Sequence, residues 1–237
     1  DNVGWLTSDE YTELKNSMLK SVYENGGFYV GRYEAGIAEN RTIKGPTNSD
    51  GKYTIEGMPT PVTKADAYPY TRITRTQAQN LASNVNSGTK TSSLMFGVQW
   101  DLVLAFMHNK GNIADSTLTS NSTTIGNYKD NLWTIKNANA QYLSSGKFVQ
   151  CPNPFKKESS SSILLTTGAD SSFSVQNIYD IAGNVFEWTL EKTSLDDFPC
   201  ALRGGGYSGD GSYFPAANRI FNFSIPVNGL GFRVTLW

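Results

Sequence analysis

The chain has 237 residues, of which 38% are apolar and 12% aromatic, and its formal net charge at pH 7 is -1. This composition is typical of a globular protein with one large domain or two small ones. The basic residues are scattered, and no apolar run reaches the length of a membrane span. We therefore expect no nucleic-acid partner and no membrane insertion.

Few side chains of the usual metal-binding and nucleophilic kinds are present. Two cysteines, Cys151 and Cys200, would form one disulfide in an oxidising compartment, or would remain two buried thiols. The single histidine, His108, nearly excludes a zinc site of the His and Cys type, and a Ser-His-Asp triad would need it as base. The sequence therefore gives no reason to expect a required cofactor.

The N-terminal part predicts a helix followed by a strand. Thr7 and Glu10 have capping-box spacing, and apolar residues recur at helical intervals until Gly26 and Gly27 end the pattern. FYVGRYEAG, residues 28–36, favours a strand that ends at Gly36. Residues 37–70 are rich in turn-forming residues and predict a long loop, with at most a hairpin around NSDGKYTI.

Two more helices are expected before a long polar region. Thr76 and Gln79 form a second capping-box pair, which predicts a helix over residues 77–85. VQWDLVLAFMH predicts another over residues 98–108, ending before Gly111. Residues 112–174 are rich in serine, threonine, asparagine and glycine, which is typical of surface loops with short strands that bury little.

Short strand-like runs return after residue 174, namely NIYDI, NVFEWTLE, CALRG and GFRVTLW. No internal repeat and no linker-like change of composition is apparent. The simplest interpretation is one α+β domain over residues 1–237, with long polar loop insertions. The glycines at positions 204–206, 209 and 211 would suit a phosphate loop, but no strong helix pattern follows them. Close approach of strands and loops is the favoured explanation.

DIAGNVFEWT, residues 180–189, allows two interpretations. Asp180 and Glu187 flank a Gly-Asn turn, so their carboxylates and the turn carbonyls could converge on a hard cation such as Ca²⁺. Alternatively, Asn184 adopts a left-handed turn and Glu187 pairs with an arginine such as Arg233. Spacing alone leaves both open.

Several motifs, in the same order along the chain, resemble the formylglycine-generating enzyme, or sulfatase-modifying factor, family. They are GGFYVGRYEAG, GVQWDLVLAF, NIYDIAGNVFEWT, RGGGY with AANR after it, and the terminal GFRV. The resemblance covers both ends of the chain but not the polar insertions. It implies an α+β, C-type-lectin-like fold with long irregular loops. It also implies a calcium site with Asp180 and Glu187 as side-chain ligands and Gly183 and Val185 as carbonyl ligands.

Enzymes of this family use a pair of cysteines after the glycine run to bind copper and activate oxygen. Laid onto this sequence, the two positions fall at about Gly209 and Phe214, neither of which supplies a thiolate. Cys200 precedes the glycine run and Cys151 lies far upstream, so neither is a substitute. The resemblance therefore implies the fold without the chemistry, and we expect no enzymatic activity.

Within this family the chain is most like the variable proteins of diversity-generating retroelements, whose C-terminal segment is rewritten by adenine-directed mutagenesis. Rewriting AAC or AAT codons cannot produce Lys, Glu, Gln, Met or Trp, and none of these five occurs in residues 207–228. This segment is rich in Tyr, Phe, Ser, Gly and Asn, the composition of an antibody-like binding surface.

Ten residues are expected to face a ligand, although some of the aromatics, Phe221 and Phe223 in particular, would alternatively pack as core. The ten are Tyr207, Ser208, Asp210, Ser212, Tyr213, Phe214, Phe221, Asn222, Phe223 and Ser224. Five other residues match the motifs of the family and are expected to stabilise the fold rather than to contact a ligand. They are Ala217, Arg219, Gly231, Phe232 and Arg233.

The expected function is that of a non-enzymatic, receptor-binding display protein on a phage tail or a bacterial cell surface. Its partner would be a protein or glycan on a target cell, bound multivalently to compensate for weak single sites. Two alternatives stay open. One is a copper oxidase of the formylglycine-generating type, and the other is a non-diversified carbohydrate-binding or structural module of the same fold.

Overall fold

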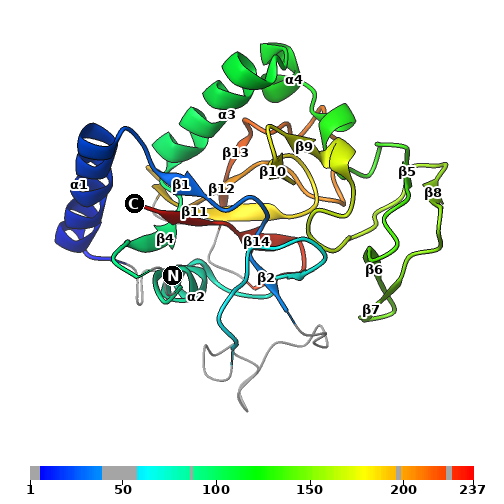
Figure 1. The fold of residues 1–237 in the computed structure, drawn as a ribbon, viewed down its shortest axis with the longest axis horizontal. Coiled ribbons are helices and arrows are strands. Elements are labelled where there is room, and N and C mark those ends of the chain that lie inside the picture. The colour runs from blue at the N-terminus through cyan, green and yellow to red at the C-terminus, as the bar shows by residue number, and fades with distance from the viewer. Residues whose placement is uncertain (1–5, 39–57, 86–87, 196–198, 223–225) are drawn as a thin grey trace.

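A computed structural model of the chain describes residues 6–38, 58–85, 88–195, 199–222 and 226–237. Helices and many short strands form an α+β structure, in agreement with the class predicted from sequence (Figure 1). The longer helices are α1 (Ser8–Asn25), α2 (Arg75–Ser83) and α3 (Gly97–Gly111), followed by the short helix α4 (Asp115–Thr119) and the 3-10 turns η1 (Thr123–Ile125) and η2 (Ser171–Phe173). The strands are β1 (Tyr29–Val30), β2 (Gly36–Ile37), β3 (Tyr68–Pro69), β4 (Ser92–Leu94), β5 (Trp133–Ile135), β6 (Gln141–Ser144), β7 (Lys147–Gln150), β8 (Phe155–Lys157), β9 (Ser174–Val175), β10 (Ile178–Tyr179), β11 (Phe186–Lys192), β12 (Cys200–Arg203), β13 (Arg219–Asn222), β14 (Leu230–Phe232) and β15 (Val234–Leu236).

Two sheets form the centre of the molecule. The larger has the strand order β13-β12-β11-β14, with β11 antiparallel to β12 and parallel to β14. The smaller has the order β1-β15-β4 and is antiparallel. Strands β14 and β15 are separated by a single residue, Arg233, so the C-terminal run GFRVTLW contributes to both sheets and connects them.

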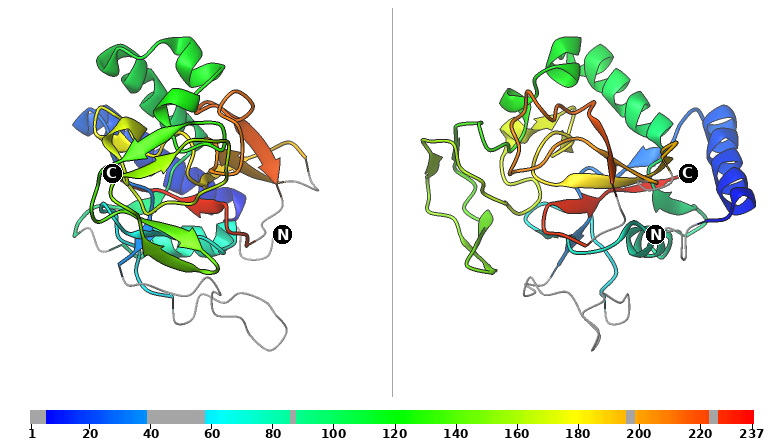
Figure 2. Two further views of the ribbon diagram at one scale, coloured as in Figure 1. Left: turned by 90° about the vertical axis from the view of Figure 1, so that its right-hand side faces the viewer. Right: turned by 180° about the vertical axis from the view of Figure 1, so that it is seen from behind.

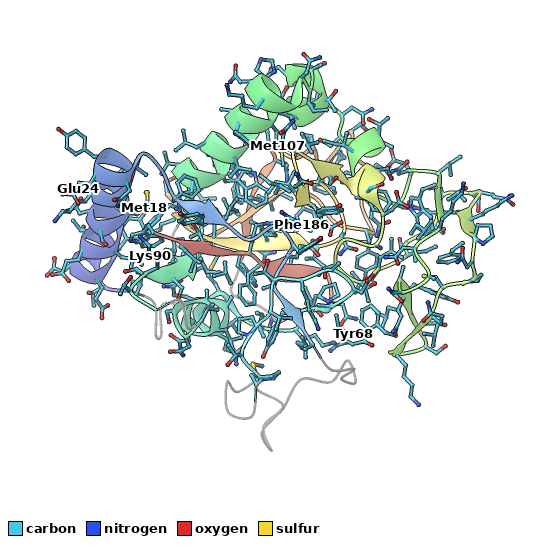
Figure 3. The ribbon with its side chains drawn as sticks, viewed as in Figure 1. Met18, Glu24, Tyr68, Lys90, Met107 and Phe186 are labelled. Atoms are coloured by element: carbon cyan, nitrogen blue, oxygen red, sulfur yellow. The ribbon has the colours of Figure 1, made fainter. Side chains whose placement is uncertain are left out.

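Helix α1 confirms the sequence prediction at both ends. The Thr7 hydroxyl accepts a hydrogen bond from the Glu10 backbone N–H, and the Glu10 carboxylate accepts one from Thr7, which completes the capping box. Gly26 ends the helix in a left-handed conformation, with φ 79°. Met18 lies on the inner side of α1 and is buried, whereas Glu24 points outward (Figure 3).

The predicted boundaries of the other two long helices need correction. Helix α2 begins at Arg75 because Thr74, and not Thr76, is its N-cap and forms the capping box with Gln77. The Gln79 side chain instead accepts hydrogen bonds from Ser93 and from the Leu94 N–H, so it is not available to cap. Helix α3 includes Gly111 and ends there, and its C-cap, Asn112, is left-handed.

The strand expected over residues 28–36 is shorter than predicted. Only Tyr29 and Val30 pair with β15, and the chain then turns before β2 pairs with β3. The hairpin expected around NSDGKYTI lies outside the described residues. The four C-terminal strand-like runs are all strands in the structure.

The expectation that residues 112–174 bury little is wrong. Strands β5 and β8 of this region form a separate core cluster around Trp133 and Phe173, and Leu118 and Tyr128 belong to a second cluster beneath α3. These side chains are apolar and aromatic, and their burial stabilises the region although most of its residues are polar. Figure 1 shows β5 to β8 of this region as a green to yellow-green arm beside the central sheets, whereas α4 lies next to α3.

The two cysteines are buried free thiols, as one of the two interpretations predicted. Cys151 belongs to the cluster around Trp133, whereas Cys200 belongs to the main core between the sheets and α2. Burial raises the pKa of Cys151 to about 11, so its reactive thiolate is scarce at neutral pH.

Candidate functional site

The predicted ligand-binding segment begins in a loop, residues 204–218, that connects β12 to β13. Strand β13 is at one edge of the four-stranded sheet, and Figure 2 shows the loop in orange beyond it. The two ends of the loop are tied to the fold. Tyr207 donates its backbone N–H to the Asn184 carbonyl at 2.9 Å, and the Trp100 indole donates to the Ala216 carbonyl at 3.0 Å.

Four side chains in the loop point to solvent. Ser208, Asp210, Ser212 and Tyr213 are exposed, and Tyr213 has 75% of its surface accessible. Within the described part of the chain, no side-chain hydrogen bond involves the two serines or Asp210. An aromatic ring among small polar groups offers a large contact area and adaptable hydrogen bonding to a partner.

Phe214 supports Tyr213 from below. Its half-buried ring makes an edge-to-face contact with Phe186, at 5.2 Å between centroids, and another with Tyr213, at 4.7 Å. A Cβ atom added at Gly209 would lie 2.5 Å from the Phe214 ring. The two positions matched to the family's cysteine pair are therefore in contact, and the phenyl ring fills the space between them.

The other predicted ligand residues do not belong to this exposed group of the loop. Tyr207 is half-buried, and burial raises its pKa although Arg72 opposes the shift. Phe221 on β13 is 54% exposed, and Asn222 is half-buried at the end of β13 that lies away from the loop. Phe223 and Ser224 lie outside the described residues.

The glycines of the loop permit close packing, which is what the favoured interpretation predicted. A Cβ atom at Gly205 would lie 2.4 Å from the Phe214 carbonyl oxygen and from the Tyr128 ring. A Cβ atom at Gly211 would lie 2.4 Å from the backbone nitrogen of Thr123. Any larger residue at Gly205 or Gly211 would push the loop away from the groups that it contacts.

A network of two arginines and two carboxylates lies at the base of the loop. Arg203 is buried and pairs with Asp101 and Glu191, and Arg219 on β13 pairs with the same two carboxylates. Sequence reasoning missed both carboxylates. Asp101 on α3 lies 102 positions from Arg203, and Glu191, although only 12 positions from Arg203, meets it through the pairing of β11 with β12. Arg219 therefore stabilises the fold, as the family resemblance implies, and half of its side-chain surface is exposed.

The predicted calcium residues lie in a buried cluster of charges. Both oxygens of Glu187 accept hydrogen bonds from Arg233, at 2.7 Å and 3.2 Å. Asp180 accepts a hydrogen bond from the Gly168 N–H at 2.7 Å, and Glu34 accepts one from the Asn184 side chain at 2.7 Å. Asn184 is left-handed, with φ 55°. The alternative interpretation, a left-handed turn with a Glu187–Arg233 ion pair, is therefore confirmed.

This arrangement does not fit a calcium ion at the predicted ligands. Both oxygens that Glu187 would offer to the ion already accept hydrogen bonds from the Arg233 guanidinium. Gly183 is packed against the Asn127 backbone. Within the residues described, no group of three or more His, Cys, Asp or Glu side chains is arranged to hold a metal ion. Calcium binding itself stays an untested prediction.

Burial dominates the electrostatics of this cluster. It raises the pKa of Asp180 to about 7 and raises the pKa of Glu187, although Arg233 opposes both shifts. For Glu34, burial and the neighbouring charges of Asp180 and Glu187 together raise the pKa well above its ordinary value. The cluster is thus a buried structural network in which the carboxyl groups release their protons at higher pH than they would in water.

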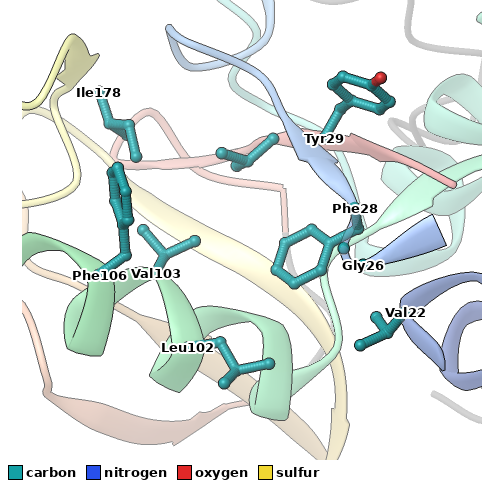
Figure 4. Close-up of a pocket in the computed structure, with 10 residues that line it drawn as sticks. Val22, Gly26, Phe28, Tyr29, Leu102, Val103, Phe106 and Ile178 are labelled. Atoms are coloured by element: carbon teal, nitrogen blue, oxygen red, sulfur yellow. The ribbon is translucent and has the colours of Figure 1, made fainter.

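An apolar pocket of about 470 Å³ lies between the end of α1, β1 and α3 (Figure 4). Phe28, Val103 and Ile178 line it together with Leu102 and Phe106 of α3, which are partly exposed. Of the ten predicted ligand residues, the eight that the structure describes do not line this pocket. None of the described helices is long and apolar enough to cross a membrane.

Comparison with known proteins finds low similarity to solved structures. Treponema denticola variable protein 1 is 16% identical, with 81% of this chain and 77% of that chain covered and a TM-score of 0.39. CarF, known from a crystal structure, is 14% identical, with 98% of this chain and 83% of that chain covered and a TM-score of 0.43. No family model and no curated protein matches the chain. Similarity at TM-scores below 0.5 assigns neither the fold family nor the function.

Proposed function

We propose that the chain is a non-enzymatic display protein that binds a ligand through its C-terminal segment, on a C-type-lectin-like fold of the formylglycine-generating type. Residues 207–228 are the segment that a retroelement diversifies. The observation that carries the proposal is the contrast within loop 204–218. Its backbone is hydrogen-bonded to the surrounding fold, while Ser208, Asp210, Ser212 and Tyr213 project outward.

The ligand is a protein or glycan on a target cell, and the protein acts on a phage tail or a bacterial cell surface. The exposed group is small, with Tyr213 as its one large side chain, so a single site would bind weakly. Presentation of many copies raises the avidity without new contacts. No cofactor is required for ligand binding.

The copper-oxidase alternative finds no support at the site. Gly209 and Phe214 supply no thiolate, and the phenyl ring occupies the space between the two positions. Copper titration and oxygen uptake on a cysteine-containing peptide are expected to show neither binding nor turnover. Stoichiometric copper binding together with oxygen uptake would reinstate the oxidase.

Ligand binding is tested with the chain tetramerised on streptavidin and applied to a glycan array and a panel of purified bacterial surface proteins. We expect a signal that disappears when Ser208, Asp210, Ser212 and Tyr213 are all replaced by alanine. The matched control is Tyr23→Ala, which removes an exposed tyrosine on α1 and should leave the signal unchanged. A signal that survives the quadruple substitution would contradict the proposal.

A further inference from the structure

The middle of loop 204–218 is held by a segment of the polar region, residues 122–130. The Ser122 backbone N–H donates to the Gly211 carbonyl at 3.0 Å, and the Lys129 N–H donates to the Gly209 carbonyl at 2.9 Å. In the opposite direction, the Gly211 N–H donates to Asp130 Oδ1 at 3.0 Å. The segment thus binds the backbone of the loop and not its exposed side chains.

Two side chains of the same segment hold the second half of the loop. Tyr128 donates its hydroxyl to the Phe214 carbonyl at 2.7 Å, and Ser122 Oγ accepts from the Ala216 N–H at 2.8 Å. Tyr128 is fully buried, and burial raises its pKa far above the ordinary value. Its hydroxyl therefore keeps the proton that it donates.

The segment is itself fixed from behind. Lys157 on β8 is only 4% exposed, and its ammonium group donates a hydrogen bond to the Tyr128 carbonyl. The same ammonium lies 5.6 Å from the centroid of the Trp133 ring. Thr123 donates its hydroxyl to Asp130 Oδ2 at 2.9 Å, which orients that carboxylate toward Gly211.

We infer that Ser122, Tyr128, Lys129, Asp130 and Lys157 form a clamp that positions the binding loop, and this inference rests on the proposed function. It assigns a role to part of the region for which the sequence offered none. Because the clamp binds carbonyl and N–H groups, it holds the loop whatever side chains the exposed positions carry.

The clamp also divides the predicted ligand residues by role. Ser208, Asp210, Ser212 and Tyr213 are the specificity positions, since their side chains are exposed and the clamp does not bind them. Phe214 is a positioning residue, because its carbonyl is bound by Tyr128 and its ring packs on Phe186. Substitution of the residues at the four specificity positions changes the binding surface and leaves the loop conformation intact.

Amide hydrogen exchange measured by NMR tests the clamp without any ligand. Asp130→Ala is expected to accelerate exchange at the Gly211 N–H by about tenfold, because the hydrogen bond to the carboxylate is lost. Asp130→Asn keeps an acceptor oxygen and should restore slow exchange. The reference is the Leu190 N–H in β11, which donates to Met95 and should not change.

Unchanged exchange at Gly211 in Asp130→Ala, or equal acceleration at Leu190, would overturn the clamp. As a second measurement, the quadruple alanine variant at the specificity positions should keep slow exchange at Gly211 and should melt within about 3 °C of the original chain. Loss of folding in that variant would also overturn it. A failure of the array experiment with an intact clamp would count against the proposed function alone.

Discussion

Glu187 and Arg233 form a buried ion pair in which both carboxylate oxygens accept hydrogen bonds from the guanidinium. Glu187 lies on β11, and Arg233 lies between β14 and β15 at the point where the two sheets meet. Arg233 also donates to the carbonyls of Gly31 and Tyr179, at 2.9 Å and 2.8 Å. The Arg233 side chain therefore connects both central sheets with β10, the strand that precedes the turn at Gly183 and Asn184.

Removal of Arg233 should destabilise the fold strongly. Arg233→Met leaves the Glu187 carboxylate buried without its partner, which costs about 3–5 kcal/mol of unfolding free energy. The double variant Arg233→Met, Glu187→Gln should lose less than the single variant, because no unpaired charge remains. Urea unfolding measures both. A single-variant loss below about 1 kcal/mol would contradict a structural role for the pair.

The buried cluster predicts that stability depends on pH. Glu34, Asp180 and Glu187 have raised pKa values in the folded state, with that of Asp180 at about 7. Between about pH 4 and pH 7 the folded chain therefore binds more protons than the unfolded chain, so this contribution to unfolding free energy falls as pH rises.

The pH effect is measured as the melting temperature at pH 5 and pH 7.5 for the original chain and for Asp180→Asn. The asparagine keeps an acceptor for the Gly168 N–H but cannot ionise, so the variant should lose less stability on going to pH 7.5. Equal pH dependence in the two chains would show that Asp180 does not carry the effect.

Calcium addition should not stabilise the protein if the Glu187–Arg233 pair persists. A ligand at 100 times its Kd would add about 2.7 kcal/mol to the unfolding free energy. Such a gain would raise the melting temperature by several degrees, whereas we expect the melting temperatures in 5 mM calcium chloride and in EDTA to agree within about 1 °C. A clear calcium-dependent rise that Glu187→Gln abolishes would instead support the metal site implied by the family resemblance.

Close packing at Gly205 gives a matched pair of substitutions. Gly205→Ala places a methyl group against the Phe214 carbonyl and the Tyr128 ring, and should cost about 1–3 kcal/mol. Gly27→Ala has no atom within 4 Å of the new methyl group, so its effect should stay within about 0.5 kcal/mol. Equal effects at the two positions would contradict the packing described for the loop.

Local sequence signals predicted the elements that depend on neighbouring residues. The capping box at Thr7 and the glycine stop at Gly26 define α1 because both act within one turn of helix. Near α2 the same signal occurs twice, at Thr74 and at Thr76. The tertiary contact of Gln79 with β4 decides between them, and no local pattern contains that information.

In the candidate site, too, some features follow from local sequence and others depend on tertiary contacts. Composition led to the prediction that ten residues of the C-terminal segment face a ligand, and four of them project from the loop into solvent in the structure. The residues that hold the loop could not be predicted, since Asp130 lies 81 positions from Gly211 and Tyr128 lies 86 positions from Phe214. The half-burial of Tyr207 and Asn222 depends on such distant contacts as well.

The most direct test of the central claim is sequencing of the gene and its flanks across the source population. The diversified display function predicts that substitutions concentrate in codons of residues 207–228, above all at Ser208, Asp210, Ser212 and Tyr213, while Tyr128 and Asp130 stay fixed. It also predicts an adenine-rich near-copy of the segment beside a reverse transcriptase gene. An invariant segment without such a copy would contradict the claim and would favour a non-diversified binding or structural module.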